Sequence, residues 1–223
     1  MKIRLRSCAA ACYDGADKCS IYGKEHDHKM AEYFDVCDEQ GLPTGEIVER
    51  SIAHRDGVPH RTAHVWLTRQ EGGRQQILLQ KRSMNKDSFP GMYDTSSAGH
   101  IPAGDEPAVS AARELEEELG IRAEEGQLQY AGFFHAEYAL PFHGSIFWDN
   151  EYVSVFVYDA PVRTEDIRIQ EEELEEVRWF DLDEVYDECA RGERERFCVP
   201  MEGMDVLKAY LARKEKICPD GVY

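Results

Sequence analysis

The chain has 223 residues, of which 42% are hydrophobic, and a formal net charge of −18, a composition typical of a globular domain with a hydrophobic core and extensions. This charge argues against binding to DNA, RNA or an anionic membrane, because the field of the whole molecule would repel a polyanion. No apolar run approaches the ~20 residues that cross a bilayer, and the basic start around Lys2 and Arg4 leads into an apolar stretch too short for a secretory signal, so we expect a cytoplasmic protein.

Residues 1–29 are expected to form a polar N-terminal extension, mobile in solution, ahead of a compact domain over 30–223. Six side chains that zinc can bind lie in or just after this extension: Cys8, Cys12, Cys19, His26, His28 and Cys37. A zinc site there stays open as an alternative, although the spacing lacks the paired Cys-x-x-Cys of common structural sites. The chain has seven cysteines, an odd number, and without an export signal we expect reduced thiols rather than a disulfide framework.

The elements of the compact domain follow from alternating apolar residues and from turn signals. Strands are expected over 33–37, 64–68, 77–81, 128–135, 152–158 and 177–179, and helices over 107–119, 182–189 and 204–214. Two segments are less regular: 45–54, a short strand or a helical turn, and 91–97, irregular with strand character. The glycines near residues 70–74 predict a hairpin between the second and third strands. This order favours a mixed α+β domain with helices flanking a sheet.

An aromatic segment lies between two of these strands. Residues 139–150 contain Phe142, Phe147 and Trp148 and are expected to form a loop. These rings would either stack on a nucleotide base or, as aromatic side chains more often do, pack against their own neighbours. Local packing is the favoured interpretation.

The helix predicted over 107–119 has signals at both ends and is about three and a half turns long. Asp105 or Glu106 can accept hydrogen bonds from its first free amides, and Pro107 fits its first turn. Gly120 can take the left-handed conformation that ends it. We therefore expect a helix with well-defined limits, whose faces can be assigned from the helical period.

One face of this helix carries clustered carboxylates. At ~100° per residue, Glu114, Glu117 and Glu118 fall within one arc of about 100°. A separate arc is apolar: Ala108, Ala111, Ala112, Leu115 and Leu119. The three like charges repel one another near the negative end of the helix dipole, so a divalent cation would stabilise them, and carboxylate oxygens suit Mg²⁺ or Mn²⁺. The alternative is a solvated acidic face, such as the run 171–176 provides.

The segment around this helix resembles the Nudix box in order and spacing: Gly99, five residues, Asp105, seven residues, Arg113-Glu114-Leu115, one residue, Glu117-Glu118, one residue and Gly120-Ile121. Asp105 stands where the family usually has glutamate. Segments before and after the box also look like the family, namely 78–82, 89–93 and 177–185, and the resemblance covers residues 33–190. It implies a Nudix α/β/α sandwich, with a mixed sheet between helices, and hydrolysis of a nucleoside diphosphate linked to another group.

The same resemblance implies roles for individual residues. Divalent metal ions, Mg²⁺ or Mn²⁺, would be held by Glu114, Glu117, Glu118 and the Gly99 carbonyl, where they neutralise the diphosphate and lower the pKa of an attacking water. Arg113 would pin one glutamate in place, and a glutamate not committed to metal would act as general base. Three basic residues are candidates for phosphate contacts, with solvent-facing cations as the alternative: Lys81, Arg82 and Lys86.

A second resemblance, to isopentenyl-diphosphate isomerase, covers residues 41–100 and the later pair 150–151. Five positions match residues that bind a metal in that enzyme: His54, His60, His100, Asp149 and Glu151. Three histidines and two acids are suitable ligands for Zn²⁺ or Mn²⁺, and local hydrogen bonding of the histidines is the alternative. The gap between the first two histidines is one residue shorter than the common bacterial spacing.

One residue disfavours the isomerase reaction itself. The isomerase uses a cysteine immediately before its Gly-His pair, and this chain has Ala98 there, whose methyl group cannot exchange a proton. The prediction is therefore a hydrolase on the isomerase-like branch of the superfamily that acts on a small-molecule diphosphate, with the isomerase as an alternative. A nucleotide-sensing module without catalysis is a third hypothesis, disfavoured by the complete set of glutamates. The C-terminal helices either cover the core or form a homodimer interface.

Overall fold

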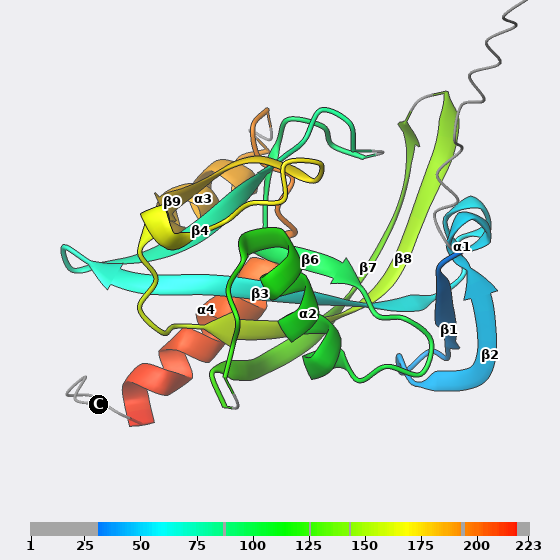
Figure 1. Ribbon diagram of the computed structural model, residues 1–223, viewed down its shortest axis with the longest axis horizontal. Helices are drawn as coiled ribbons and strands as arrows, with labels where there is room; N and C mark the ends of the chain where they lie inside the picture. The colour runs from blue at the N-terminus through cyan, green and yellow to red at the C-terminus, as the bar shows by residue number, and fades with distance from the viewer. Residues whose placement is uncertain (1–30, 87, 125, 143, 193–194, 218–223) are drawn as a thin grey trace, which may run out of the picture. The chain divides into compact units, whose positions relative to one another are not determined.

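The computed structural model describes residues 31–217 except 87, 125, 143 and 193–194 (Figure 1). The described strands are β1 (Tyr33–Cys37), β2 (Pro43–Glu49), β3 (His60–Glu71), β4 (Arg74–Arg82), β5 (Tyr93–Asp94), β6 (Ser97–His100), β7 (Leu128–Phe142), β8 (Ser145–Tyr158) and β9 (Leu174–Asp181). The described helices are α1 (Arg50–Asp56), α2 (Pro107–Leu119), α3 (Leu182–Ala190) and α4 (Met201–Ile217), with a 3-10 turn, η1 (Thr164–Asp166).

The predicted N-terminal extension, 1–29, and the question of zinc binding within it lie outside the described residues. Of the six side chains named for that site, only Cys37 is described. It is buried in β1, and burial raises the pKa of its thiol to about 11. A thiol with so high a pKa stays protonated and is a poor nucleophile.

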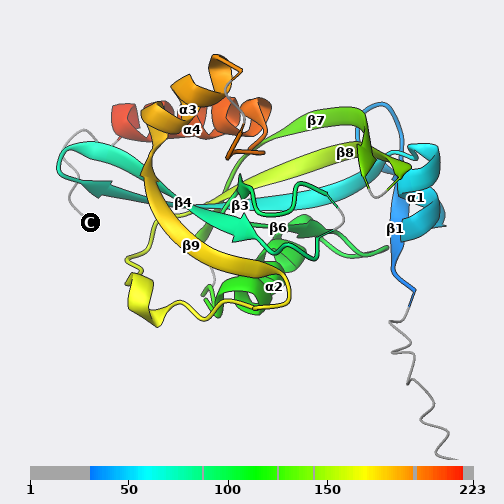
Figure 2. The ribbon, with the colours of Figure 1, turned by 90° about the horizontal axis from the view of Figure 1, so that it is seen from above.

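Strand β3 belongs to two half-sheets. Its residues 68–71 pair antiparallel with β4, whereas residues 62–65 pair antiparallel with β6 and residues 60–67 pair in parallel with β8. Strands β5 and β9 extend the β4 half, and β7 extends the β8 half (Figure 2). Because β4 pairs only with the end of β3, the two half-sheets separate toward the start of that strand.

Helices cover both faces of this mixed sheet (Figure 2). On one side, Leu115 and Leu119 of α2 join Val65 and Leu67 of β3 in a buried cluster. On the other side, α3 and α4 enclose a second cluster that contains Trp66 of β3. Alternate residues of a strand point to opposite faces, which is why neighbouring residues of β3 belong to different clusters. The predicted α+β sandwich is confirmed.

Helix α2 has the limits that the sequence predicts. It begins at Pro107, and Gly120, with a φ of 68°, follows its last residue. The predicted side-chain cap is wrong, because Glu106 occupies the cap position and makes no capping hydrogen bond. The predicted apolar face also shifts: Ala108 is exposed, whereas Glu118 is buried among the helix residues that face the sheet.

The largest departure from the sequence prediction is the long hairpin of β7 and β8. The loop predicted over 139–150 is wrong, because the two strands stay paired through it as far as Phe142 and Ser145. Aromatic and β-branched residues favour strands, and the chain reverses at Gly144, whose φ is 82°. Phe142 and Phe147 pack edge-on, with ring centroids 6.2 Å apart. These two aromatic side chains therefore pack against each other, as the favoured interpretation predicts.

Other elements extend the predicted ones. The segment 45–54 contains both proposed forms, because β2 ends at Glu49 and α1 begins at Arg50. Helix α4 is longer at both ends than the predicted 204–214, and it packs on β7 and α3. It therefore covers the core, while a homodimer stays a prediction. No helix in the described ranges is long and apolar enough to span a membrane.

Candidate active site and histidine cluster

Glu118 is the most deeply buried of the α2 glutamates, at 4% exposed. Its Oε2 accepts hydrogen bonds from the backbone N–H of Ala98 at 3.2 Å and from Nε2 of Gln80 at 3.4 Å. Burial raises the pKa of Glu118 to about 8, and the charge of nearby Glu114 adds to this shift. A buried carboxylate of this kind is stabilised in its charged form by a bound cation.

Glu114 approaches the backbone of β6 at a point where only glycine leaves room. A Cβ atom on Gly99 would lie 2.2 Å from the carboxyl carbon of Glu114, which is closer than real atoms approach. Burial raises the pKa of Glu114, and Arg113, whose Nη2 lies 2.8 Å from Oε1, partly offsets that shift. This close approach brings the Glu114 carboxylate and the backbone of Gly99 together. Oxygen atoms from both can bind one metal ion only if they lie this close to each other.

Arg113 joins Glu114 to Glu117, in agreement with the predicted pinning of one glutamate. Its Nη1 donates a hydrogen bond to Glu117 Oε2 at 3.1 Å, and its Nη2 donates one to the backbone oxygen of His100 at 3.5 Å. The Glu117 side chain is 53% exposed, so it faces solvent beside the buried pair. Arg113 is thus in contact with two of the three clustered glutamates.

The three predicted phosphate contacts have different surroundings. Arg82 is partly buried and bound internally, with Nη1 donating to Asp94 Oδ2 at 3.0 Å and Nε to the Ser88 carbonyl at 3.0 Å. Lys81 Nζ lies 2.8 Å from a carboxylate of β9. Lys86 also has an acidic partner, and its charge acts on Glu118, where it lowers the pKa. Of these three basic residues, Lys86 is therefore the one whose charge acts on an α2 glutamate.

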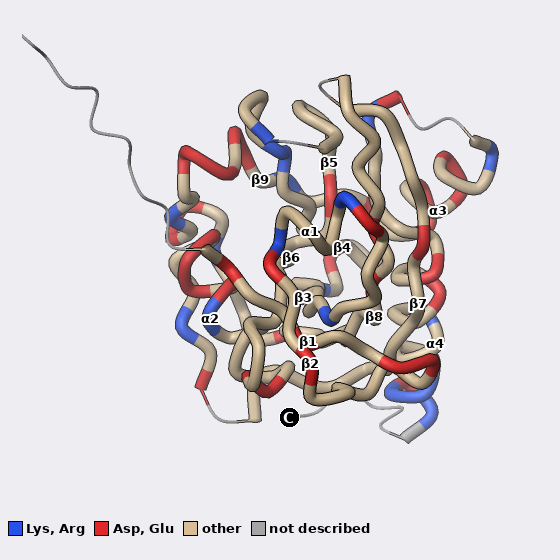
Figure 3. The backbone as a smooth tube through the Cα atoms, turned by 90° about the vertical axis from the view of Figure 1, so that its right-hand side faces the viewer, with Lys and Arg blue, Asp and Glu red and all other residues tan. Residues whose placement is uncertain are grey.

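Acidic residues occur over much of the domain (Figure 3). They line α3 without a basic residue, while α2 carries both signs of charge. The acidic surface expected around 171–176 is present, with most of these glutamates exposed. The α2 cluster differs from such a surface because two of its three glutamates are largely buried.

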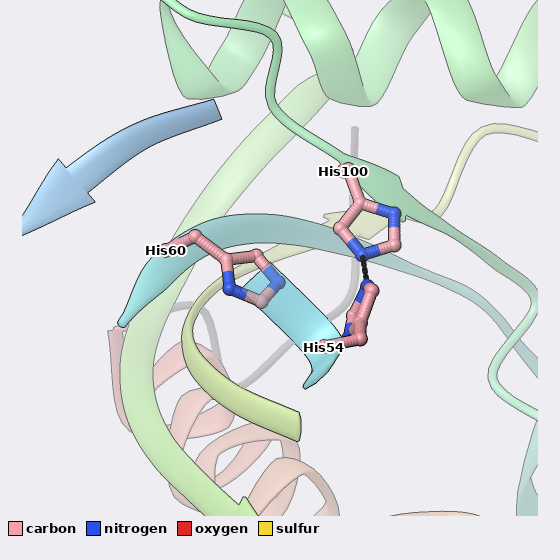
Figure 4. Close-up of side chains that lie close together, drawn as sticks. All are labelled: His54, His60 and His100. Carbon is pink, nitrogen blue, oxygen red and sulfur yellow. Dashed lines mark hydrogen bonds between the residues drawn. The ribbon is translucent and has the colours of Figure 1, made fainter. Parts of the chain in front are cut away.

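Three predicted histidines come together from separate elements: His54 from α1, His60 from the first residue of β3 and His100 from the last residue of β6 (Figure 4). One ring nitrogen from each lies within 4.8 Å of the others. The Nε2 atoms of His54 and His100 are 3.1 Å apart. Phe34 stacks on the rings of His60 and His100, at centroid distances of 4.9 and 4.5 Å, and fixes their planes.

The two predicted acids of β8 complete this cluster. Asp149 Oδ1 lies 2.8 Å from His54 Nδ1, and Glu151 Oε1 lies 3.7 Å from His60 Nε2 and 3.5 Å from His100 Nε2. Burial raises the pKa of Glu151, but the adjacent histidines, His60 first, lower it further than burial raises it. We call these five residues, three histidines and two acids, the histidine cluster.

The donor atoms of the histidine cluster fit a divalent ion. Two ligand atoms that each lie ~2.1 Å from one ion, at angles of ~90–110°, are ~3.0–3.4 Å apart, close to the His54 Nε2–His100 Nε2 and Glu151 Oε1–His100 Nε2 separations. Asp149 meets the other nitrogen of His54, Nδ1, and so orients that ring. His54 Nδ1, His60 Nε2 and Asp149 Oδ1 are buried and lack a hydrogen bond of good geometry in the described residues, although two of them are close neighbours. His60 Nδ1 lies 2.8 Å from the Val58 carbonyl and donates to it, which leaves the Nε2 lone pair facing the cluster.

Arg50 is a neighbour of the cluster that sequence reasoning missed. Its Nη1 donates to His100 Nδ1 at 2.9 Å and to Glu32 Oε2 at 3.0 Å. Because His100 Nδ1 accepts this hydrogen bond, the proton of the neutral imidazole is on Nε2. An ion can bind Nε2 only if the proton moves to Nδ1. Arg50 must then lose its hydrogen bond to His100 and keep the one to Glu32. Arg50 precedes His54 by four residues on α1, so it lies one helical turn away on the same side of the helix. This spacing could have been used only if the helix within 45–54 had been predicted to begin at Arg50.

Comparisons with known proteins agree with this geometry. The NUDIX domain family model matches residues 58–198. The chain is 40% identical over 155 residues to Nudix hydrolase 3 of Arabidopsis thaliana, a match that covers 69% of this chain but only 20% of that protein's length. It is 28% identical over 153 residues to an isopentenyl-diphosphate Delta-isomerase of Escherichia coli, covering 69% of this chain and 79% of the isomerase.

A solved structure of a Deinococcus radiodurans protein has the same fold, with a TM-score of 0.60 at 16% identity, over 80% of this chain and 99% of that one. The family model spans more than half of the chain and includes α2 with its glutamates. On these grounds the chain belongs to the Nudix family.

Proposed function

We propose that the protein is a divalent-metal-dependent hydrolase that cleaves the diphosphate linkage of a nucleoside diphosphate derivative. The observation that carries this proposal is the packing of α2 against β6, where Glu118 is buried, Glu114 meets Gly99 and Glu117 stays exposed beside them. Carboxylates in this arrangement need a cation, and hard oxygen ligands favour Mg²⁺ or Mn²⁺. The name of the Arabidopsis relative, Nudix hydrolase 3, agrees with hydrolysis.

Different residues of the active site have different roles in this reaction. Glu114, Glu117, Glu118 and the Gly99 carbonyl hold the metal, which when bound neutralises the diphosphate and lowers the pKa of a water. Arg113 keeps two of these carboxylates in place through its 2.8 and 3.1 Å contacts. A glutamate oxygen that is not bound to metal accepts the proton of the attacking water.

The experiment that tests this function is a phosphorus NMR and mass-spectrometry screen with Mg²⁺ or Mn²⁺. The panel contains nucleoside di- and triphosphates, sugar nucleotides, dinucleotides and isopentenyl diphosphate. We expect cleavage of a diphosphate bond that stops when the metal is chelated. Binding of a nucleotide without any turnover would contradict the hydrolase and support the sensing module instead.

The histidine cluster favours the isomerase as the second candidate function. Its five residues lie close together, which supports this candidate, yet Ala98 occupies the place of the isomerase cysteine. A methyl group cannot transfer a proton, so we rank this function below hydrolysis. Conversion of isopentenyl to dimethylallyl diphosphate in the same screen would reverse that order.

We further propose that the histidine cluster binds one divalent ion, Zn²⁺ or Mn²⁺, independently of the α2 site. His60→Ala is expected to weaken Zn²⁺ binding by at least ~tenfold, because it removes one ligand from a nearly closed set. Isothermal titration of the EDTA-treated, dialysed protein with Zn²⁺ measures this. His135→Ala is the matched control, since His135 is exposed, is not one of the five cluster residues, stacks on Tyr152 and has Asn150 as its hydrogen-bond partner. Equal Zn²⁺ affinity in His60→Ala and the unaltered protein would contradict the site.

A further inference from the structure

His64 of β3 is a buried polar residue without a role in the reaction described so far. It lies on the same face of β3 as His60 and Thr62, because alternate residues of a strand share a face. Thr62 Oγ1 donates to Glu151 Oε2 at 3.3 Å, so the polar character of this face extends inward from the histidine cluster. On the neighbouring strand β6, the residue paired with His64 is Ala98.

The imidazole of His64 is enclosed, yet one of its hydrogen-bonding atoms is unused. The residue is 8% exposed, and its ring meets Phe134 edge-on with centroids 5.9 Å apart. Within the described part of the chain, Nδ1 of His64 is buried and has no hydrogen-bond partner. Buried polar atoms in folded proteins are nearly always hydrogen-bonded, because leaving one unpaired costs free energy. A partner from solution therefore belongs at this atom.

Ala98 connects His64 with the carboxylates of α2. Its backbone N–H donates to Glu118 Oε2 at 3.2 Å. Its methyl group lies on the same face as the imidazole, since directly paired residues of two strands share a face, and so small a side chain leaves room beside the ring. Glu118 therefore contacts β6 at the residue that is paired with His64, so a group attached to a diphosphate held by the α2 glutamates starts beside the strand pair that carries the imidazole.

The charges around His64 argue against an anion as that group. Burial lowers the pKa of His64, so its imidazole is neutral, and the charged groups that act on it are Asp94, Glu151 and Asp149 with a single cation, Arg82. Arg82 is already paired with Asp94 at 3.0 Å. A divalent ion in the histidine cluster would balance the charges of Asp149 and Glu151. The groups around His64 would then still include no positive charge that is free to bind a phosphate.

We propose that His64 is a specificity-determining residue, whose Nδ1 hydrogen-bonds an uncharged polar group, such as a hydroxyl, on the moiety joined to the diphosphate. This inference rests on the proposed function and deepens it. It names as substrates nucleoside diphosphates linked to an uncharged polar group, such as a sugar, in preference to those that carry a further phosphate. The competing explanation is structural: the ring fills the core, and Nδ1 binds a buried water.

The test compares two substrates and three variants. ADP-ribose carries an uncharged ribose beyond its diphosphate, and ATP carries a further phosphate. His64→Phe keeps a ring against Phe134 and removes both nitrogens, whereas His64→Asn keeps a polar atom near the position of Nδ1. His135→Phe is the control, because it makes the same replacement at an exposed ring stacked on Tyr152. KM and kcat are measured for each variant, with melting temperatures to check the fold.

His64→Phe is expected to raise KM for ADP-ribose about tenfold or more, the size of one lost hydrogen bond, with kcat within about threefold. KM for ATP should stay within about threefold, and His64→Asn should recover part of the loss. A changed melting temperature with unchanged KM for both substrates would overturn the proposal in favour of the structural role. So would an equal rise in KM for ADP-ribose and ATP.

A binding measurement separates this proposal from the proposed function. Imidazole ¹⁵N spectra are recorded with and without the non-hydrolysable α,β-methylene analogue of ADP-ribose, and the His64 signals are assigned by their loss in His64→Phe. A shift of the Nδ1 resonance on addition of the analogue supports the contact even if the protein hydrolyses nothing. An unmoved resonance overturns the contact, whatever the outcome of the activity screen.

Discussion

Glu117→Gln is expected to lower metal-dependent turnover at least about a hundredfold, the scale on which loss of a group central to catalysis acts. The substitution removes one ligand charge and keeps the size of the side chain. Because Glu117 is 53% exposed, its replacement should leave the fold intact. The measurement is kcat with the substrate identified by the phosphorus NMR screen, together with the melting temperature.

The same helix provides the matched control for this variant. Glu116 is the preceding residue, is exposed and pairs with Arg122 rather than with the active-site residues. Glu116→Gln makes the same charge change one position away and should keep turnover within about twofold. Near-normal turnover in Glu117→Gln, or equal losses in both variants, would contradict the assignment of Glu117 as a metal ligand.

Gly99→Ala is expected to lower turnover about as much as Glu117→Gln does, for a steric reason. The added Cβ would lie 2.2 Å from the carboxyl carbon of Glu114 and 2.6 Å from its Oε1. Strand β6 cannot retreat easily, because Gly99 is paired with Ala63 of the buried strand β3. Glu114 must therefore turn away from the site, and we expect kcat to fall about a hundredfold or more, with weaker Mn²⁺ binding in a calorimetric titration.

A double variant shows whether the clash acts through Glu114. If Gly99→Ala works by displacing this carboxylate, then adding Glu114→Ala to it should cost little more than either single change, because the two changes remove the same contribution. Full additivity of the two losses would instead mean that the methyl group disturbs β6 in another way. Turnover in the Gly99→Ala variant that equals that of the unaltered protein would refute the close approach itself.

The regular part of the site could be predicted from sequence because it lies within one helix. The spacing of Glu114, Glu117 and Glu118 fixes their shared arc as soon as the helix is identified, and Pro107 and Gly120 mark its ends unambiguously. The depth of each residue could not be predicted in this way. It depends on where β6 and β4 lie, and only the tertiary packing makes Glu118 buried and Glu117 exposed.

The histidine cluster could not be assembled from the local pattern. His54 and His60 are close in the sequence, but β6 and β8, which carry the other members, follow much later, so only the resemblance to the isomerase linked them. His64 belongs to no recognisable spacing, and the four-residue spacing of Arg50 and His54 has meaning only once α1 is known to begin at Arg50. The paired stretch 139–150 was mistaken for a loop because its strand propensity is expressed only when β7 and β8 pair along their whole length.

The shared strand β3 makes the two halves of the histidine cluster unequal in stiffness. His60 is the first residue of a strand of 12 residues and pairs with Glu151 of β8, while later residues of the same strand pair with β6 and β4, so His60 is attached to the central sheet. His54 belongs to a helix of 7 residues in which only Ala53 and His54 are buried. Local opening costs least free energy where few side chains are buried, so α1 can fray while β3 holds. For the ion site proposed at this cluster, we therefore expect exchange to be governed by the α1 side, while His60 keeps its place on the sheet.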